Sequence, residues 1–443
     1  MNQRKKAIVV GSGIAGLTAA HELEKSGWDA IVLERNAFAG GRMANVRCGN
    51  MLLETGATEI FSFYKDLLLL VEECGLTDQL VEADVYRCFR IKNNGKEYDF
   101  DYGATLLALL MSKALSTASK LRLPALMPDI ARFKKNVDPC LIDSAAEYDD
   151  MDLQTYLTKK VGRDFSDGFI APLFRLFWRW QPDAFSRAYF LAFIAHSLGS
   201  KIYTFRNGVG TLTQALAERL PVRYNCEVVS VSPTFGGSVR VEYSAPQGDI
   251  VEECDVVVMA TEASCISPLI GDLSDADRQF FETVRYTQGM AAHYLLKREI
   301  EPRSIIFAAD DPSKLLSYAQ VPRDFPGFPG VPSRIWASLT PEYLEANIAP
   351  DGSNLDEITR PHVEALYPSL EEDLMEAHMQ YEGWRLVLIY PGFIREMKRF
   401  LDRRKNVDGR YYFCGDYLAH PHTGGACASG KGVARQIIER FGQ

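Results

Sequence analysis

The chain has 443 residues, of which 47% are hydrophobic and 24% are charged, and this length and composition predict a globular protein of about two domains. Its 49 lysine and arginine residues against 58 aspartate and glutamate residues give a net charge of −9, which argues against nucleic acid as a partner. The nine cysteines show no Cys-x-x-Cys pair and no metal-ligand spacing, so we expect a reducing compartment, no disulfide framework and no metal site.

The sequence contains no pattern typical of targeting or of a membrane span. Residues 1–6 are too short and too basic for a signal peptide, and a strand is predicted from residue 7. The longest apolar run, residues 104–111, is far shorter than the roughly 18 residues that cross a bilayer. We therefore expect a cytoplasmic protein.

The chain begins with a strand, a glycine-rich turn and a helix. Residues 7–10 predict a buried parallel strand, Gly11, Gly13 and Gly16 follow in G-x-G-x-x-G spacing, and a helix is predicted over residues 17–25. Gly11 permits the tight turn, Gly13 lets the backbone approach a pyrophosphate, and Gly16 lets the helix pack closely on the strand. The free N–H groups at the helix start then face a diphosphate. The predicted phosphate contacts are Gly11, Gly13, Ile14, Ala15 and Gly16.

A carboxylate ends the next predicted strand. Gly27 closes the helix, residues 28–33 predict a strand, and Glu34 follows it. A carboxylate at this place accepts hydrogen bonds from ribose hydroxyls and disfavours a 2′-phosphate. A β-α-β unit without a ligand is the alternative, and the complete setting favours a dinucleotide.

The next residues carry a family resemblance. Glu-Arg-Asn-Ala-Phe-Ala-Gly-Gly-Arg, residues 34–42, resembles the E-x(n)-G-G-R loop of the superfamily of FAD-dependent amine oxidases, protoporphyrinogen oxidases and phytoene desaturases. The resemblance implies that Gly40, Gly41 and Arg42 lie along the FAD diphosphate, with Arg35 as a further cofactor contact. Nicotinamide dehydrogenases lack this loop, so the resemblance implies FAD rather than NAD.

Two stretches that follow extend the prediction. Residues 51–60 resemble the family stretch beside the isoalloxazine ring, which implies that Gly56, Ala57 and Thr58 lie near the flavin. Residues 85–102 then change to strand character around an Asn-Asn-Gly turn, which is typical of a hairpin. We expect this hairpin to belong to a second, sheet-containing domain inserted into the nucleotide-binding fold.

Residues 104–135 are rich in leucine and alanine and carry several lysines and arginines. One interpretation is a pair of helices lying on an anionic membrane surface, and the equivalent segment of protoporphyrinogen oxidases associates with membranes in some members. The interrupted apolar pattern favours the other interpretation, a soluble helical cap over the active site.

Residues 171–180 contain a dense aromatic set: Phe174, Phe177, Trp178 and Trp180. These side chains either wall a pocket for a flat or apolar substrate or pack between helices, and the pattern leaves both open. Arg175 and Arg179 are spaced to face a substrate carboxylate together, although solvated surface positions are favoured.

The middle of the chain returns to the nucleotide-binding fold. Thr211 is predicted to cap a helix that ends at Pro221. Residues 227–231 resemble the family strand whose first valine pairs its backbone with adenine, and that role falls on Val228. Residues 253–261 resemble the strand that rejoins the sheet.

The C-terminal stretch resembles the family motif I-Y-x-A-G-D … G-A-x-x-S-G-x-x-A-A. A strand over residues 411–414 delivers Asp416 to a ribityl hydroxyl or to the diphosphate edge. A final helix follows, and its positive N-terminus is aimed in relatives at the flavin N1–C2 edge, which favours the anionic reduced flavin. The implied contacts are Gly415, Asp416, Gly424, Gly425 and Ala426.

These motifs together imply an α/β fold, with a Rossmann-like FAD-binding domain of the GR2 type, an interleaved α+β substrate domain and a helical cap. The expected FAD-binding domain comprises residues 1–80, 205–265 and 400–443. The expected substrate domain comprises residues 81–204 and 266–399, with the cap at about 104–200.

The flavin implies hydride transfer from a substrate carbon to its N5 atom. Amine oxidases place a lysine on a substrate-domain strand, and the matching position here is His293. Lys297 is close enough in the sequence to be an alternative match. Residues 382–386 offer no cysteine for a covalent flavin bond, so we expect non-covalent FAD. Trp384 in this segment is a second candidate catalytic residue.

The resemblance leaves the substrate open. Residues 52–76 look closest to protoporphyrinogen oxidases, so the leading prediction is oxidation or desaturation of a hydrophobic, ring-containing small molecule. A carotenoid-type desaturase and an amine oxidase are the alternatives among redox enzymes. From another class, the chain could bind FAD without net redox turnover, as a sugar mutase does, with Arg175 and Arg179 as the only indication. The sequence assigns no oligomeric state.

Overall fold

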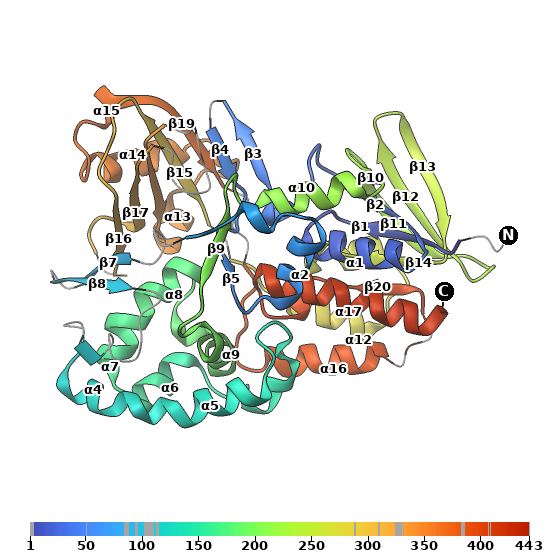
Figure 1. Ribbon diagram of the computed structural model, residues 1–443, viewed down its shortest axis with the longest axis horizontal. Helices are drawn as coiled ribbons and strands as arrows, with labels where there is room; N and C mark the ends of the chain where they lie inside the picture. The colour runs from blue at the N-terminus through green and yellow to red at the C-terminus, as the bar shows by residue number, and fades with distance from the viewer. Residues whose placement is uncertain are drawn as a thin grey trace.

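The computed structural model describes residues 4–49, 51–83, 88–93, 96–101, 110–111, 115–287, 289–308, 311–323, 330, 332–381, 386–405, 407 and 409–442. Figure 1 shows two lobes side by side. The right-hand lobe contains the first strands and the last helix, and the left-hand lobe contains a second sheet above a group of helices.

A five-stranded parallel sheet forms the centre of the right-hand lobe, in the order β10-β2-β1-β14-β20. Every neighbouring pair of strands is parallel. Residues 7–10 are apolar and fully buried, as expected for a strand covered on both faces. The strands come from the first, middle and last parts of the chain: β1 (Lys6–Val10), β2 (Asp29–Leu33), β10 (Val222–Arg223), β14 (Val256–Met259) and β20 (Tyr411–Phe413).

Helices cover both faces of this sheet. The side chains of Ala7 and Val9 pack in one core with the first and last helices, and those of Ile8 and Val10 pack in another with α12 and α16. In that second core the rings of Phe280 and Phe400 stack at 4.3 Å. The covering helices are α1 (Ile14–Lys25), α2 (Lys65–Glu73), α10 (Gly210–Arg219), α11 (Ile266–Leu269), α12 (Asp275–Thr283), α16 (Phe393–Lys405) and α17 (Thr423–Phe441).

Glycine allows α1 and α17 to approach each other and the sheet. A Cβ at Gly16 would lie 2.1 Å from the carbonyl oxygen of Gly11, and one at Gly430 would lie 2.1 Å from the carbonyl oxygen of Ala15. Neither position can carry a side chain unless the backbone moves.

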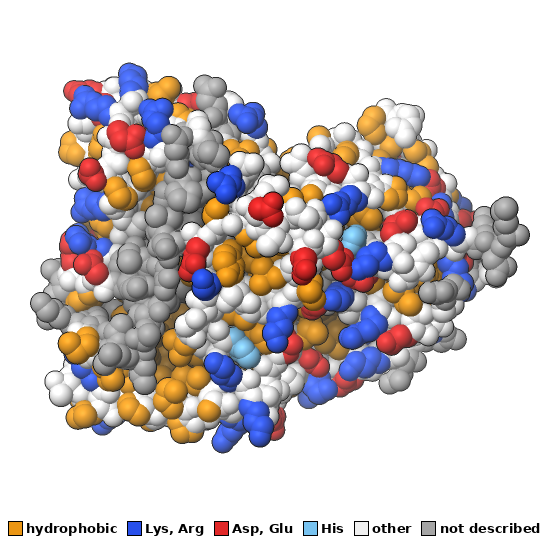
Figure 2. Space-filling model, viewed as in Figure 1, with side chains coloured by type: hydrophobic (Ala, Val, Ile, Leu, Met, Phe, Trp, Pro, Cys, Tyr) orange, Lys and Arg blue, Asp and Glu red, His pale blue; other side chains and the backbone are white. Residues whose placement is uncertain are grey.

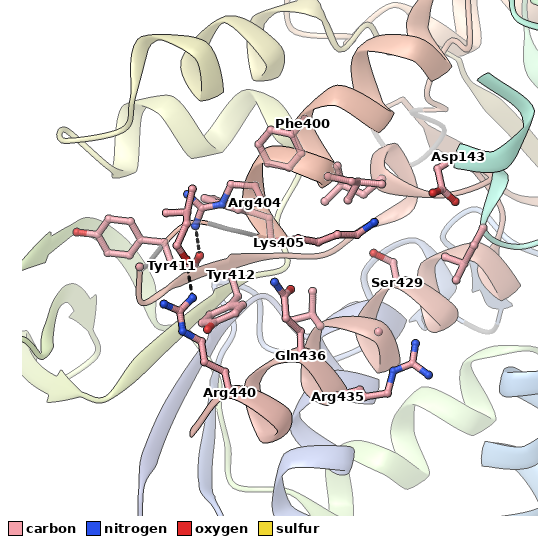
Figure 3. Close-up of a pocket in the computed structure, with 18 of the residues that line it drawn as sticks. Asp143, Phe400, Arg404, Lys405, Tyr411, Tyr412, Ser429, Arg435, Gln436 and Arg440 are labelled. Atoms are coloured by element: carbon pink, nitrogen blue, oxygen red, sulfur yellow. Dashed lines mark hydrogen bonds between the residues drawn. The ribbon is translucent and has the colours of Figure 1, made fainter. Parts of the chain in front are cut away.

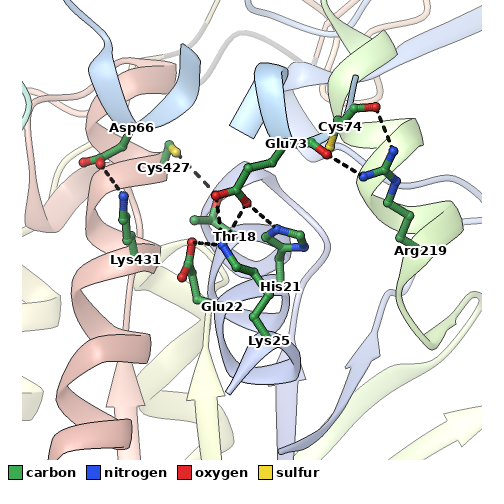
Figure 4. A network of polar contacts seen from close by, with 10 residues as sticks. All are labelled: Thr18, His21, Glu22, Lys25, Asp66, Glu73, Cys74, Arg219, Cys427 and Lys431. Carbon is green, nitrogen blue, oxygen red and sulfur yellow. Dashed lines mark hydrogen bonds and ion pairs between the residues drawn. The ribbon is translucent and has the colours of Figure 1, made fainter. Parts of the chain in front are cut away.

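Polar contacts join four of these helices (Figure 4). Glu73 on α2 accepts hydrogen bonds from His21 and Lys25 on α1, each at 2.9 Å. Asp66 on α2 pairs with Lys431 on α17 at 2.7 Å. Arg219 of α10 donates to the last carbonyl groups of α2, so α2 is tied to three helices from distant parts of the chain.

The left-hand lobe is built on a seven-stranded mixed sheet in the order β19-β15-β18-β17-β16-β7-β8. The antiparallel pairing of β7 with β8 confirms the predicted hairpin, whose residues 94 and 95 lie outside the described residues. The strands are β7 (Cys88–Asn93), β8 (Lys96–Asp101), β15 (Ala291–Leu296), β16 (Arg303–Phe307), β17 (Leu315–Val321), β18 (Arg334–Leu339) and β19 (Leu374–Gln380). The helices beside it are α13 (Pro341–Asn347), α14 (Leu355–Glu364) and α15 (Leu370–Asp373).

Smaller sheets and a helical group complete the fold. An antiparallel meander contains β11 (Glu227–Pro233), β12 (Val239–Ala245) and β13 (Gly248–Cys254). Short pairings contain β3 (Asn45–Cys48) with β4 (Met51–Glu54), and β5 (Ile60–Phe61) with β9 (Ile202–Phe205) and β6 (Leu80–Glu82). The helical group contains α4 (Thr117–Arg122), α5 (Met127–Asn136), α6 (Leu153–Lys160), α7 (Arg163–Phe165), α8 (Ala171–Trp178) and α9 (Arg187–Ser197).

Several boundaries differ from the sequence prediction by one or more residues, and three of the differences have a clear structural cause. Helix α1 begins at Ile14 rather than residue 17, because the turn needs only two residues after Gly11. The Thr211 cap is wrong: α10 begins at Gly210, and the Thr211 hydroxyl donates to the Gly208 carbonyl from inside the first turn. The strand predicted over 253–261 is interrupted at residue 255, because β13 ends at Cys254 and only β14, which begins at Val256, joins the parallel sheet.

The two large sheets are formed by the chain segments that the sequence prediction assigned to the two domains. All strands of the parallel sheet lie within residues 1–80, 205–265 and 400–443, and all strands of the mixed sheet lie within 81–204 and 266–399. The domain boundaries themselves remain a prediction. Among the described residues, no helix is both long and apolar enough to cross a bilayer.

Candidate functional site

The three glycines of the first turn differ in what surrounds them. Gly11 adopts φ +103°, and a Cβ there would lie 3.0 Å from the Ala260 carbonyl oxygen. Gly16 packs against Gly11, as described above. A Cβ at Gly13 would meet no atom within 4 Å, so internal packing does not require this glycine.

The open space at Gly13 lies at an uncapped helix start. Gly13 is the N-cap of α1 and provides no side-chain hydrogen bond, and the first turn, with Ile14 and Ala15, contains no acidic residue. The first N–H groups of a helix have no partner within it. This arrangement fits an anionic phosphate group.

The carboxylate of Glu34 holds the glycine turn in place. Its Oε2 atom accepts hydrogen bonds from the backbone N–H and the hydroxyl of Ser12, at 3.0 and 2.6 Å, and its Oε1 atom accepts from the Asn36 N–H at 2.8 Å. A carboxylate has about four acceptor positions. Glu34 is therefore a structural residue of the turn that keeps acceptor capacity for a ribose. Arg35 beside it is exposed.

A backbone hydrogen bond at Glu34 brings the segment that contains Val228 close to this carboxylate. The N–H of Cys226 donates to the Glu34 carbonyl at 2.8 Å. Val228 follows on β11, and the ladder with β12 has a bulge between Val228 and Ser230. The predicted contact of Val228 with adenine is consistent with this proximity and remains a prediction.

Arg42 and Asp416 form a two-pronged ion pair. Arg42 Nη1 lies 2.7 Å from Asp416 Oδ2, and Nη2 lies 2.9 Å from Oδ1. The pair joins the Gly40–Gly41 loop, whose glycines adopt φ +112° and +53°, to the C-terminal motif. Two motifs that are far apart in the sequence therefore meet at one place.

The stretch predicted beside the flavin ring is anchored to the same loop. The Ala57 N–H donates to the Arg42 carbonyl at 2.8 Å, and the Thr55 hydroxyl donates to the Gly41 carbonyl at 2.6 Å. Gly56, Ala57 and Thr58 are partly exposed. The predicted diphosphate and ring contacts are thus neighbours in the structure.

The start of α17 is packed against aromatic rings. A Cβ at Gly424 would lie 2.4 Å from Tyr64 Cγ, one at Gly425 would lie 2.0 Å from the His420 carbonyl oxygen, and Ala426 is buried beside them. Gly415 adopts φ +154°, and its N–H donates to the Ser429 hydroxyl at 3.1 Å. These glycines are required by packing and backbone conformation.

His422 caps α17, which the sequence prediction missed. Its Nδ1 accepts from the Gly425 N–H at 2.9 Å, so Nε2 carries the hydrogen that it donates to the Pro139 carbonyl at 3.1 Å. Burial lowers the pKa of His422 to about 3. The cap is therefore a neutral imidazole. The His-Pro-His sequence before the glycine pair was the available signal.

A continuous stack of rings leads from this cap. Ring centroids are 4.3 Å apart between Tyr64 and His422, 4.3 Å between His422 and His420, and 4.5 Å between His420 and Tyr189. Trp178 meets Tyr189 edge to face at 5.6 Å. Burial also lowers the pKa of His420 well below its usual value. We call the five rings Tyr64, His422, His420, Tyr189 and Trp178 the aromatic wall.

The other aromatic residues predicted in this segment are partly in the core and partly accessible to solvent. Phe174 is buried and packs on Trp178 at 4.4 Å, whereas Phe177 and Trp180 are partly exposed. Both arginines of this segment are buried and bonded within the protein. Arg175 pairs with Glu342 at 2.8 Å, and Arg179 donates to the Ser338 hydroxyl at 2.9 Å.

His293 lies in the centre of β15 and is 6% exposed. The Gln380 side chain donates to the Glu54 carbonyl at 3.4 Å, so its Oε1 atom faces His293 Nε2 at 3.3 Å and that nitrogen carries the hydrogen. Burial, with the charge of Arg334, lowers the pKa of His293 to about 3. Lys297 is exposed and donates to the Glu372 carbonyl. Trp384 lies outside the described residues.

Two carboxyl groups near the predicted flavin stretch were also missed. Burial raises the pKa of Glu54 to about 8, although the charge of Arg334 opposes the shift, and burial raises the pKa of Glu59 to about 7. They flank residues 55–58 in the sequence. Among the described residues, no cluster of three or more histidine, cysteine or acidic side chains is arranged to hold a metal ion.

Comparison with known proteins identifies the family. The family described as flavin-containing amine oxidoreductases matches residues 14–438. The chain belongs to this family. It is therefore an oxidoreductase of a family that uses FAD, and the open, uncapped start of α1 fits that cofactor.

The relatives differ in the reaction they catalyse. A 1-hydroxycarotenoid 3,4-desaturase of Flavobacterium sp. (strain P99-3) is 46% identical over 52 residues, which are 12% of this chain and 11% of that protein. The mitochondrial protoporphyrinogen oxidase of Nicotiana tabacum is 29% identical over 125 residues, 27% of this chain and 23% of that one. The crystal structure of putrescine oxidase with putrescine is similar over 99% of this chain and 100% of that chain, with a TM-score of 0.73 and 16% identity, which shows the fold alone.

Proposed function

We propose that this chain oxidises or desaturates a hydrophobic, ring-containing small molecule, as protoporphyrinogen oxidases do, with FAD bound non-covalently. The observation that carries the proposal is the aromatic wall. It adjoins the N-terminus of α17, which relatives aim at the flavin, and both of its histidines are neutral. Tyr64, His420 and Tyr189 are buried, whereas His422 and Trp178 are partly exposed. A flat apolar molecule would pack on these two uncharged rings, which the buried rings hold in place.

The chain's own residues would hold the cofactor by backbone and charge. The first turn of α1 and the Gly40–Arg42 loop would face the diphosphate, and Arg42 is held in position by Asp416. Glu34 would accept from the ribose while it fixes Ser12. When bound, FAD supplies the acceptor for a substrate hydride.

Arg175 and Arg179 already bond to other side chains of this protein, and this argues against a sugar mutase. Arg175 and Arg179 would have to meet a sugar diphosphate in such an enzyme, but they bond to Glu342 and Ser338. Carotenoid-type desaturation remains compatible with the aromatic wall, and the partial match to a carotenoid desaturase supports it.

Oxidation of an amine is a second candidate, because of the two carboxyl groups near the predicted ring stretch. Glu54 is 8% exposed, and one of its oxygens accepts no hydrogen bond from the described residues. The positive charge of a substrate ammonium group beside Glu54 would lower the pKa of this carboxyl group and favour an ion pair. The family description also favours amines as substrates.

Anaerobic titration of the purified yellow protein separates these candidates. Bleaching of the flavin by a porphyrinogen or a polyene, without bleaching by amines, is the result expected from the leading proposal. Bleaching by amines alone would select the second candidate. Turnover of a substrate only by chemically reduced enzyme, without bleaching, would exclude both.

A further inference from the structure

A cleft lies between α16 and α17, on the side of α17 that faces away from α1 (Figure 3). Its volume is about 300 Å³ and its floor is formed by β20. Lys405 from α16 and Gln436 from α17 extend into it from opposite sides, as Figure 3 shows. A cavity of this size is at the lower end of the range for small-molecule sites.

A glycine in the middle of α17 keeps this cleft open. A Cβ at Gly432 would meet no atom within 4 Å, whereas one at Gly430 would collide with Ala15. Glycine weakens the interior of a helix relative to alanine. Packing explains Gly430 and does not explain Gly432, just as packing does not explain Gly13 at the predicted phosphate site.

The rim of the cleft is basic although the protein is acidic. Arg404, Lys405, Arg435 and Arg440 line it with a single acidic residue, Asp143, in a chain whose net charge is −9. Asp277, outside the cleft, accepts from Arg404 at 3.2 Å and also from Arg403 at 3.3 Å. Asp402, also outside the cleft, pairs with Lys405 at 3.1 Å and with Lys398 at 2.8 Å. Each of these two carboxylates therefore faces two basic groups, which leaves an excess of positive charge.

The lining between these charges is apolar. The apolar side chains that line it are Phe400 and Leu401 of α16, Phe413 of β20, Leu418 of the turn before α17, and Val433 of α17. Leu401 is partly exposed, and the other four are buried. An inorganic anion would leave this surface in contact with water, and an uncharged apolar molecule would leave the basic rim unused.

We propose that this cleft binds a small amphipathic anion, with its carboxylate or phosphate group at Lys405 and Arg435 and its apolar part on the surface around Leu401 and Val433. The site is separate from the candidate FAD site and does not depend on the proposed function. It touches that site at one point, because Ser429 lines the cleft and accepts a hydrogen bond from Gly415.

Calorimetric titration of the FAD-loaded full chain with sodium octanoate, at low ionic strength, tests this proposal. Wild-type protein is expected to bind one octanoate. Gly432 lines the cleft and has open space at its Cβ, so Gly432→Leu is expected to occupy the cleft and abolish that binding. The double variant Lys405→Gln/Arg435→Gln is expected to weaken it at least tenfold. Arg399→Gln removes a charge from the same helix outside the cleft, where Arg399 pairs with Glu396, and is expected to bind octanoate like the wild type.

Two further probes define the class of ligand. 1-Octanol and inorganic phosphate each supply half of the predicted interaction, so each is expected to bind at least tenfold more weakly than octanoate. No octanoate binding by the wild type, unchanged binding in Gly432→Leu, or phosphate binding as tight as that of octanoate would each overturn the proposal. Flavin absorbance and thermal unfolding verify that each variant is folded, and if Gly432→Leu is not, the charge variants decide.

Discussion

At the scale of single residues, the glycines of the first turn divide into those that the fold requires and one that it does not. Gly11 and Gly16 face backbone atoms, whereas the space at Gly13 is open. The motif alone predicts a dinucleotide site, but it cannot tell these roles apart. The atoms around each Cα show which of these glycines the fold requires and which one is left for binding a ligand.

Replacement of Gly13 by leucine should give a folded protein without FAD. Gly13 adopts φ −64°, ψ 168°, which leucine also adopts, and its side chain would occupy the space predicted for the diphosphate. Absorbance at flavin wavelengths and the circular dichroism spectrum measure the two effects. Gly16→Ala is the matched contrast and should lower the stability by about 1–3 kcal/mol through a clash with Gly11. A yellow Gly13→Leu protein would refute the phosphate assignment.

Glu34→Ala should weaken both FAD binding and the fold. The substitution removes a charge-assisted hydrogen bond to the ribose, worth roughly 1.5–3 kcal/mol of binding, and leaves the buried Ser12 N–H without its acceptor, at a cost of roughly 1–3 kcal/mol. Fluorescence titration of apoprotein with FAD measures the first effect, and urea unfolding of apoprotein measures the second. Full affinity in a destabilised variant would place the ribose elsewhere.

The residues that the sequence did not reveal act through contacts between distant segments. His422 caps α17 while it donates to Pro139, and Gln380 links Glu54 to His293. Neither role has a local pattern, because the partner is supplied by another part of the chain. The glycine-rich loops could be predicted because their function depends on backbone conformation, which is encoded by adjacent residues.

At the scale of helices and strands, α4 and α5 present an exposed face that the sequence pattern left open between two interpretations. Leu121 is 78% exposed and Met127 is 39% exposed. Figure 2 shows hydrophobic side chains gathered over this edge of the molecule. Five basic residues accompany them, Lys120, Arg122, Arg132, Lys134 and Lys135. The one acidic residue of the two helices, Asp129, bonds to Lys160 and Tyr156.

This surface should bind anionic vesicles more strongly than neutral ones. Insertion of apolar side chains and attraction of basic ones act together at a lipid surface. Co-sedimentation with phosphatidylglycerol vesicles measures the binding, and Lys134→Gln/Lys135→Gln should weaken it by about 1 kcal/mol per charge. Leu121→Glu should abolish it, whereas Leu69→Glu, at another exposed leucine, should not. Equal binding by both glutamate variants would favour the soluble cap.

Helix and strand positions were predicted well wherever periodicity was strong, and the errors fall at ends. The Thr211 cap failed because Gly210 can already adopt helical conformation and hydrogen-bonds to Asn45, a residue far away in the sequence. The interruption at residue 255 separates two sheets, and one apolar run gives no sign of such a change.

At the scale of the whole molecule, buried groups in both lobes give the stability a defined pH dependence. Burial raises the pKa of Glu54 to about 8 and of Glu59 to about 7, so their contribution is complete below about pH 4.5 and falls as pH rises to 8. Burial lowers the pKa of His293 and His422 to about 3, so their contribution is complete above about pH 6.5 and falls as pH falls. His420 shifts in the same direction. Three histidines outweigh two carboxyl groups below pH 6.5, so the stability should be greatest near that pH.

Glu54→Gln should flatten the alkaline side of this profile. Glutamine keeps the shape of the protonated carboxyl group but cannot ionise, so the variant should gain roughly 2–4 kcal/mol relative to the wild type between pH 5 and pH 8. Urea unfolding of the FAD-loaded protein at several pH values measures the slope. Glu439→Gln, at an exposed carboxylate on α17, should leave the slope unchanged. A parallel profile for Glu54→Gln and the wild type would mean that Glu54 is ionised in the folded protein. In that case the buried carboxylate would be available at neutral pH to pair with an ammonium group, and the amine would replace the ring-containing molecule as the leading candidate substrate.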